Sequence, residues 1–139
     1  MTILLLVEDD ADHRQRMLGA IAEVSTVDVV SKVDGSSALE YLQQFNPKTS
    51  GAPAAIFLDL SMPCVSGFDV LRQLRHHADA CHIPVLVFTE SEREVDVYLS
   101  YHLGANAYVV KPRDPEEFKR TISLATSFWL NTNVRSPRR

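Results

Sequence analysis

Acidic, hydroxyl and ammonium side chains follow four of the chain's apolar runs, at the point where each run ends. They are Glu8 and Asp9 after the first run, Asp59 after the third, Thr89 after the fourth and Lys111 after the fifth. A carboxylate can bind a hard cation or attack phosphorus, and a hydroxyl and an ammonium can bind phosphoryl oxygens. Each residue alone is weak evidence, because acids at strand ends often cap helices. The combination predicts one site, at the edge of the sheet, that binds a cation together with a phosphoryl group.

The charge of this group indicates that the site also binds a cation. Two carboxylates about 4 Å apart repel each other by roughly 4 kcal/mol at an effective dielectric constant of about 20. A cluster of Glu8, Asp9 and Asp59 would therefore need protons or cations, and Lys111 supplies one positive charge. Mg²⁺, or Mn²⁺ in its place, is a suitable complement because it binds carboxylates together with phosphate oxygens and water.

Five short apolar runs predict five β-strands. They are Ile3–Val7, Val27–Val33, Ala54–Leu58, Val85–Phe88 and Ala107–Val110. Three of them are nearly continuous, as is typical of parallel strands covered on both faces, whereas 27–33 is more mixed and suits a less buried position. Helix-like stretches alternate with these runs five times. We therefore predict an α/β fold: a doubly wound, five-stranded parallel sheet with five helices on its two faces, and ligands at the carboxyl ends of the strands.

Residues that favour helix starts support this alternation. Asp10 caps the first helix, and Ser37 with Glu40 and Ser91 with Glu94 have the spacing of a capping box. The last helix has the clearest start, with Asp114 as N-cap and Pro115 at the first position. Its predicted core stripe consists of Phe118, Ile122, Ala125 and Trp129.

Length and composition exclude several classes of protein. The 139 residues suffice for one domain, and we expect a domain over 1–130 with a short polar, basic tail over 131–139. A net charge of −4 argues against nucleic-acid binding by the fold. The sequence has neither a membrane-spanning apolar stretch nor a signal peptide, so we expect a cytoplasmic protein without a membrane partner. Two cysteines and five histidines lack metal-ligand spacing and are assigned no chemistry.

At the residues of the predicted site, the sequence resembles the receiver domain of bacterial response regulators, a CheY-like fold. The segments that carry the resemblance are LLVEDD, IFLDLSMPCVSGFDVL, IPVLVFTES and GANAYVVKP, and together they extend from about Ile3 to Trp129. The resemblance implies the strand order 2-1-3-4-5 of the flavodoxin-like folds. It also implies a single-domain response regulator of a two-component phosphorelay, which catalyses only its own phosphotransfer and dephosphorylation.

The resemblance assigns a role to each matching residue. Asp59 is the phosphoacceptor, and its partner is a sensor histidine kinase or a histidine phosphotransfer protein. Mg²⁺ is held by Glu8, Asp9 and Asp59 and by the backbone carbonyl of Ser61. Thr89 and Lys111 bind the phosphoryl group, and Tyr108 is the aromatic switch whose rotamer follows Thr89. Pro112 matches a proline that follows a cis peptide bond.

The loop Asn46–Pro53 and the terminal SFWL resemble the stand-alone regulators that are paired with bacterial phytochromes, many of which form homodimers through the fourth helix, fifth strand and fifth helix. Helical spacing places Val95 and Leu99 on the core face of the fourth helix and Val97 and Tyr101 largely away from it. On the fifth helix, Leu124 and Phe128 flank the core stripe. We expect a partner surface made of Val97, Tyr101, Tyr108, Leu124 and Phe128.

Two alternative functions remain open at this point. A phosphatase of the haloacid-dehalogenase type also uses an aspartyl nucleophile, but it requires a second Asp two residues later, where this chain has Ser61. An adaptor that works without phosphorylation would have no use for the charged cluster, which costs free energy to assemble. The sequence does not identify the kinase, the signal or the downstream target. It also does not indicate whether phosphorylation makes or breaks a dimer.

Overall fold

The computed structural model describes residues 2–45 and 52–137. The strands are β1 (Ile3–Val7), β2 (Asp28–Lys32), β3 (Ala55–Leu58), β4 (Val85–Thr89) and β5 (Ala107–Val110). The helices are α1 (Ala11–Val24), α2 (Gly35–Gln44), α3 (Gly67–Arg75), α4 (Glu94–His102) and α5 (Pro115–Ser127), and a π-helical turn η1 (Phe128–Thr132) continues α5. The predicted α/β alternation is confirmed, with strand bounds that differ by at most one residue.

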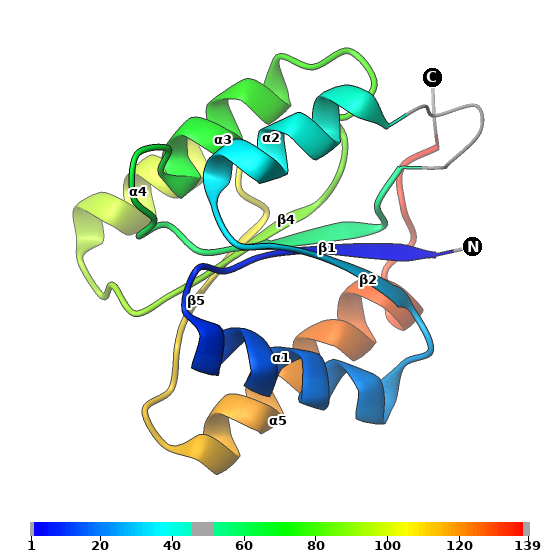
Figure 1. The fold of residues 1–139 in the computed structure, drawn as a ribbon, viewed down its shortest axis with the longest axis vertical. Coiled ribbons are helices and arrows are strands. Elements are labelled where there is room, and N and C mark those ends of the chain that lie inside the picture. Colours follow the sequence, from blue (N-terminus) through cyan, green and yellow to red (C-terminus); the bar gives the residue numbers. More distant parts are fainter. Residues whose placement is uncertain (1, 46–51, 138–139) are drawn as a thin grey trace.

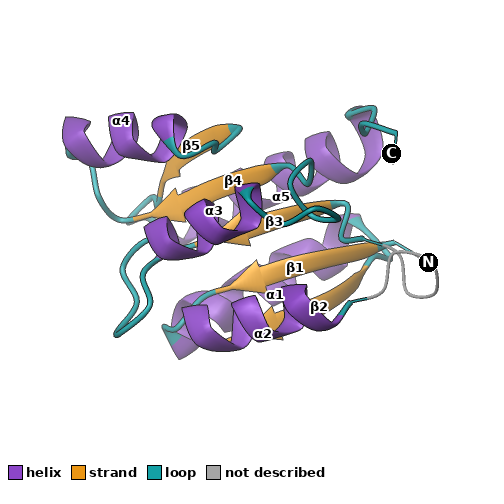
Figure 2. Cartoon of the chain, turned by 90° about the horizontal axis from the view of Figure 1, so that it is seen from above, coloured by secondary structure: helices purple, strands orange, loops and turns teal. Residues whose placement is uncertain are grey.

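The strands form one parallel sheet in the order β2-β1-β3-β4-β5, as predicted. Helices α2, α3 and α4 cover one face of the sheet, and α1 and α5 lie side by side on the other (Figure 1). Because all strands run the same way, their carboxyl ends meet at one edge (Figure 2). This edge is where the polar residues that follow the strands can meet.

Successive side chains along each strand point to opposite faces of the sheet, so the core consists of two layers. From β1, Leu5 and Val7 pack with α2 and α3, whereas Leu4 and Leu6 pack with α1 and α5. Strands β1, β3 and β4 are buried throughout, which explains why their sequences are nearly continuous apolar runs. The edge strand β2 is only partly buried, in agreement with its mixed sequence.

The helix caps agree with the prediction at α1 and α5 and differ elsewhere. Asp10 accepts a hydrogen bond from the backbone of His13, and Asp114 accepts one from Glu117. Helix α2 begins earlier than predicted, because Asp34 is its N-cap and accepts a hydrogen bond from the Ser37 backbone. A capping box not predicted from the sequence starts α3, formed by Ser66 and Asp69, and α4 has no side-chain cap.

The predicted orientation of α4 is wrong for Val95 and Val97, whereas Tyr101 is exposed as expected. Val95 was expected in the core but is 53% exposed, whereas Val97, expected to point outward, is half-buried. Ser100 is the buried residue of the helix, since its hydroxyl donates to the carbonyl of Asp96 and needs no other partner. Because a polar residue faces the core, the spacing of the apolar residues along α4 does not indicate which face of the helix is buried. The outer face instead carries Tyr98 and Tyr101, which are 69% and 50% exposed.

Several further expectations can be compared with the structure. No cis peptide bond occurs among the described residues, so the expected cis bond before Pro112 is not found. The core stripe of α5 is confirmed: Phe118 and Ile122 are buried, and Ala125 and Trp129 pack against the same layer. The predicted domain boundary between 130 and 131 falls inside η1, and most of the loop 46–53 lies outside the described residues. Within the described ranges, no helix is long and apolar enough to cross a membrane.

Candidate functional site

The predicted site residues meet at the carboxyl edge of the sheet. Residues from the ends of β1, β3, β4 and β5 line an open pocket of about 400 Å³, namely Asp9, Asp10, Asp59, Ser61, Thr89, Glu90 and Lys111. Glu8 lies directly beside this pocket, with its carboxylate oxygen within 4.8 Å of those of Asp9 and Asp59. The parallel register explains the gathering, because each of these residues is the last of its strand or follows the strand by at most three positions.

The three carboxylates of this cluster have different environments. Glu8 is 1% exposed and Asp59 is 5% exposed, whereas Asp9 lies at the surface. Lys111 Nζ lies 2.7 Å from Glu8 Oε1 and 3.6 Å from Asp59 Oδ2. One buried ammonium therefore serves two buried carboxylates, and its closer partner is Glu8.

Both carboxylate oxygens of Glu8 are already engaged. Oε1 pairs with Lys111, and Oε2 accepts a hydrogen bond of 3.2 Å from the backbone of Asp10. Burial and, to a smaller extent, the negative charge of Asp59 raise the pKa of Glu8 to about 7, against the opposing effect of Lys111. The ionised form of Glu8 is thus destabilised, because the positive charge of Lys111 only partly compensates for burial and for the charge of Asp59.

The Asp59 carboxylate is held more loosely than that of Glu8. The backbone of Ser61 donates to Oδ1 at 3.4 Å, and Lys111 lies 3.6 Å from Oδ2. These contacts are longer than an ordinary charge-assisted hydrogen bond, which measures about 2.7–2.9 Å. The oxygens of Asp59 therefore face the pocket with weak partners, as a metal ligand or a nucleophile requires.

The donor set fits a hard divalent cation. Glu8, Asp9 and Asp59 offer carboxylate oxygens, the ligands that Mg²⁺ and Mn²⁺ favour, and the cluster carries more negative than positive charge. Because Glu8 already uses both oxygens, a cation would bind Asp9 and Asp59 more directly and Glu8 through water.

Two further predicted residues, Thr89 and Tyr108, lie on β4 and β5. Thr89 is buried at the end of β4 and lines the pocket. Tyr108 on β5 is half-buried, and its hydroxyl donates to the carbonyl of Ser91 at 2.9 Å. Burial raises the pKa of Tyr108, so its hydroxyl keeps its proton and the hydrogen bond persists. The side chain of Tyr108 is thereby tethered to the loop that leads into α4.

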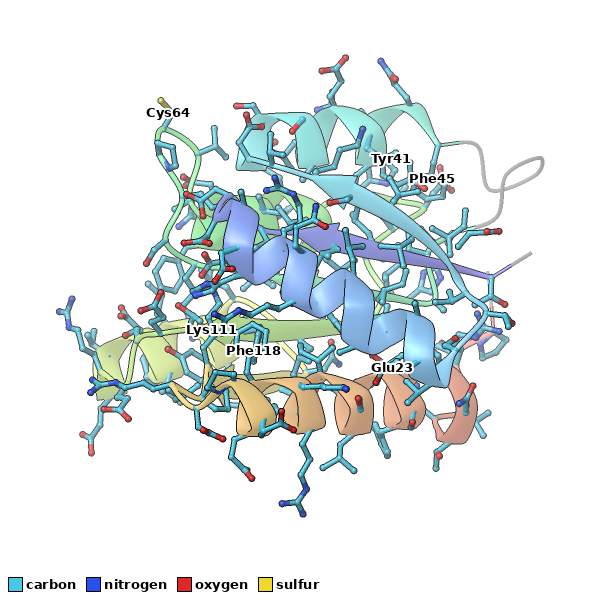
Figure 3. All side chains as sticks on the ribbon, turned by 60° about the horizontal axis from the view of Figure 1, so that its bottom comes forward. Glu23, Tyr41, Phe45, Cys64, Lys111 and Phe118 are labelled. Atoms are coloured by element: carbon cyan, nitrogen blue, oxygen red, sulfur yellow. The ribbon has the colours of Figure 1, made fainter. Side chains whose placement is uncertain are left out.

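The loop after β3 is shaped by close backbone packing. A Cβ atom at Gly67 would collide with the carbonyl of Asp59 and would lie 2.8 Å from Leu60 Cα. Cys64, exposed at the tip of the same loop (Figure 3), has a φ of 66°, a conformation that costs free energy for a residue with a Cβ. The start of α3 is thus pressed against the backbone of Asp59.

Sequence reasoning missed Glu90, which lines the pocket, and also His13, which contacts Lys111. His13, on the first turn of α1, places Nδ1 at 2.9 Å from Lys111 Nζ. Its position three residues after the N-cap Asp10 was the available signal, because the first turn of a helix that follows β1 faces the carboxyl edge of the sheet. The histidine spacing gave no such indication.

Comparison with known proteins decides the family. The family model described as response regulator receiver domain matches residues 4–123. The chain belongs to the response regulator receiver domain family. This receiver domain is therefore a module of two-component signalling, as the resemblance implied.

The relatives of this receiver domain include phytochrome response regulators. Response regulator Rcp1 of Synechocystis sp. is 37% identical, with 94% of this chain and 90% of Rcp1 covered. Its Mn²⁺-bound form superposes with a TM-score of 0.88 over 99% of this chain and 100% of that one, at 32% identity. The phosphorylated cyanobacterial phytochrome response regulator RcpA superposes with a TM-score of 0.90, at 30% identity over 98% and 99% of the two chains.

A relative from a different pathway is nearly as similar. The probable methanogenesis regulatory protein FilR2 of Methanothrix harundinacea is 34% identical over 97% of this chain and 87% of its own length. Sequence similarity thus places the receiver domain close to phytochrome response regulators, without separating it from other stand-alone regulators.

Proposed function

We propose that the protein is a response regulator that accepts a phosphoryl group on Asp59 in a metal-dependent reaction. The observation that carries the proposal is the convergence of Asp59, the carboxylates of Glu8 and Asp9, and the ammonium of Lys111 in one pocket. The donor is a phosphohistidine of a sensor histidine kinase or of a histidine phosphotransfer protein. The protein catalyses its own phosphotransfer and dephosphorylation and no reaction of a separate substrate.

In the proposed reaction, a carboxylate oxygen of Asp59 attacks phosphorus. The phosphorus–nitrogen bond of the donor breaks as an acyl phosphate forms, and the donor imidazole keeps the electron pair and takes up a proton. Asp59 suits the role of nucleophile because its oxygens have only long contacts, at 3.4 and 3.6 Å. Lys111 pairs with the phosphoryl oxygens, and the hydroxyl of Thr89 donates to one of them.

Mg²⁺ or Mn²⁺ would be held by Asp9, Asp59 and the backbone carbonyl of Ser61, with Glu8 contributing through water. Such an ion would neutralise charge on the phosphoryl oxygens. In support of this proposal, the carboxylates of this cluster lie within reach of one cation, and the related Rcp1 has a Mn²⁺-bound form.

Signalling would follow from movement of Thr89 and Tyr108. When Thr89 turns toward the phosphoryl group, it leaves room for the ring of Tyr108. In the unphosphorylated structure, the hydroxyl of Tyr108 donates to the carbonyl of Ser91. Loss of that tether would change the loop before α4 and the surface beside it. Output would be a changed protein contact, most simply a homodimer through α4, β5 and α5.

The same proposal covers the remaining expectations. We infer a receiver domain over residues 1–130, a short basic tail over 131–139 and a cytoplasmic location without nucleic-acid or membrane partners. A bacterial phytochrome kinase is the proposed donor, because Rcp1 and RcpA resemble this chain over nearly its whole length.

The decisive experiment is phosphotransfer from a ³²P-labelled kinase in the presence of Mg²⁺. We expect acid-labile label on the native protein and none on Asp59→Asn, with Asp79→Asn, an exposed aspartate outside the site, labelled like the native protein. Label on Asp59→Asn, or none on the native protein with any candidate kinase or with acetyl phosphate, would contradict the proposal and favour the adaptor. Steady hydrolysis of a phosphomonoester would favour the phosphatase.

A further inference from the structure

Lys111 has a third close neighbour that the proposed reaction does not use. Its Nζ lies 2.9 Å from His13 Nδ1, a residue 98 positions away in the sequence. The imidazole ring packs at 5.5 Å from the ring of Phe118, a buried residue of α5. The contact thus joins the first turn of α1 to the end of β5 over a buried aromatic support.

The chemistry of this contact fixes the state of the histidine. A lysine ammonium only donates hydrogen bonds, so Nδ1 of His13 must be the acceptor and carry no proton. The ring is then neutral, with its proton on Nε2. The His13 side chain is 21% exposed, so most of the ring is packed against its neighbours.

The ammonium of Lys111 has three N–H donors and now has two short partners. Nζ lies 2.7 Å from Glu8 Oε1 in an ion pair and 2.9 Å from His13 Nδ1, whereas Asp59 Oδ2 lies farther away, at 3.6 Å. The two short contacts restrict the orientation of the ammonium group that also faces Asp59.

We propose that His13 is a positioning residue for Lys111: its neutral imidazole holds one ammonium proton and so directs another at the phosphoryl group on Asp59. The proposal rests on the proposed phosphorylation of Asp59. It adds a residue on α1 to the set that determines how fast the phosphoryl group is accepted.

The test compares two substitutions by their rate of phosphorylation with phosphoramidate and Mg²⁺. His13→Leu keeps the packing on Phe118 but removes the acceptor, and we expect a rate roughly tenfold lower, the factor that one ordinary hydrogen bond supplies. His13→Asn places an amide oxygen near the position of Nδ1, and we expect a rate within about twofold of the native one.

Nitrogen NMR of the His13 ring gives a readout that needs no phosphorylation. We expect an unprotonated Nδ1 at neutral pH in the native protein and in Asp59→Asn. A proton on Nδ1, equal rates for all three proteins, or equal losses in His13→Leu and His13→Asn would each overturn the positioning role. If the native protein takes up no more phosphoryl than Asp59→Asn, the proposed function fails, and the ring tautomer still decides whether the contact exists.

Discussion

Three carboxylates of one site differ because the backbone gives them different partners. Glu8 is buried and holds Lys111, Asp59 is buried with long contacts, and Asp9 is exposed to water. A charged group that is buried with incomplete compensation favours protonation, which is the cause of the raised pKa of Glu8. The ionised Glu8 thus lowers the stability of the metal-free protein, while its ion pair holds the ammonium of Lys111 in place.

This argument predicts a pH-dependent effect of Glu8→Gln on stability. The pKa of Glu8 is about 7 in the folded protein and has an ordinary value of 4.5, so the folded state binds the proton more tightly. Its stabilising contribution is therefore complete below about pH 4.5 and is lost as pH rises through 7. We expect the free energy of unfolding of the native protein, measured in urea with EDTA, to fall relative to that of Glu8→Gln over this range.

Glu40→Gln is the matched control, because Glu40 is an exposed glutamate on α2. Its difference from the native protein should stay constant across the same pH range. A constant difference for Glu8→Gln as well would mean that Glu8 is not protonated preferentially in the folded state.

The position of Asp59, directly after β3, depends on the close packing of the start of α3 against its backbone. Gly67, the first residue of α3, donates from its backbone to the carbonyl of Leu60 at 3.0 Å, and any Cβ there would meet the backbone of Asp59 and Leu60. The capping box of Ser66 and Asp69 fixes the same turn from the other side. The phosphoacceptor is thus held by its neighbouring elements more than by its own contacts.

We therefore expect Gly67→Ala to impair both stability and phosphorylation. The new methyl group must displace backbone atoms rather than a flexible side chain, and we expect a loss of about 2–3 kcal/mol in the free energy of unfolding, with slower labelling of Asp59. Gly19→Ala is the control, because nothing lies within 4 Å of its Cβ and it sits on α1. It should stabilise the protein by roughly 0.5–1 kcal/mol and label normally. Equal effects of the two changes would argue against the close approach.

Over the molecule as a whole, the exposed apolar side chains are concentrated beside the β5 edge of the sheet. Val95, Tyr98 and Tyr101 on α4 are 53%, 69% and 50% exposed, and Leu124 and Phe128 at the end of α5 are 61% and 48% exposed. Single exposed apolar residues are common, but several on neighbouring elements indicate a partner surface. On α4, the exposed surface thus contains Val95 and Tyr98 in place of Val97. Tyr101, Leu124 and Phe128 are exposed as expected.

Tyr101→Asp tests the proposed dimer through α4, β5 and α5. A charge placed at such an interface would lose its water on association, so we expect the mass from light scattering to fall from dimer to monomer. Val33→Asp is the control, because Val33 is also 50% exposed but follows β2 at the opposite edge of the sheet. A native protein that is already monomeric, phosphorylated or not, would remove the proposal.

The sequence by itself determined the strands, their parallel arrangement and the residues that reach the carboxyl edge. Continuous apolar runs report burial on both faces, and position after a strand is enough to place Glu8, Asp59, Thr89 and Lys111 at one edge. Both signals are local, and parallel topology converts them into proximity. The start of α5 was predicted for the same reason, since Asp114 and Pro115 act within one turn.

Only the tertiary structure decided the facing of α4, the unequal partners of the carboxylates and the contact of His13 with Lys111. The inward serine of α4 satisfies its hydroxyl within the helix, so hydrophobic spacing could not reveal it. The contact between residues 13 and 111 depends on how α1 packs across the ends of the strands, a relation between side chains 98 positions apart. Such distances arise from the packing of complete elements and have no counterpart in the local order of residues.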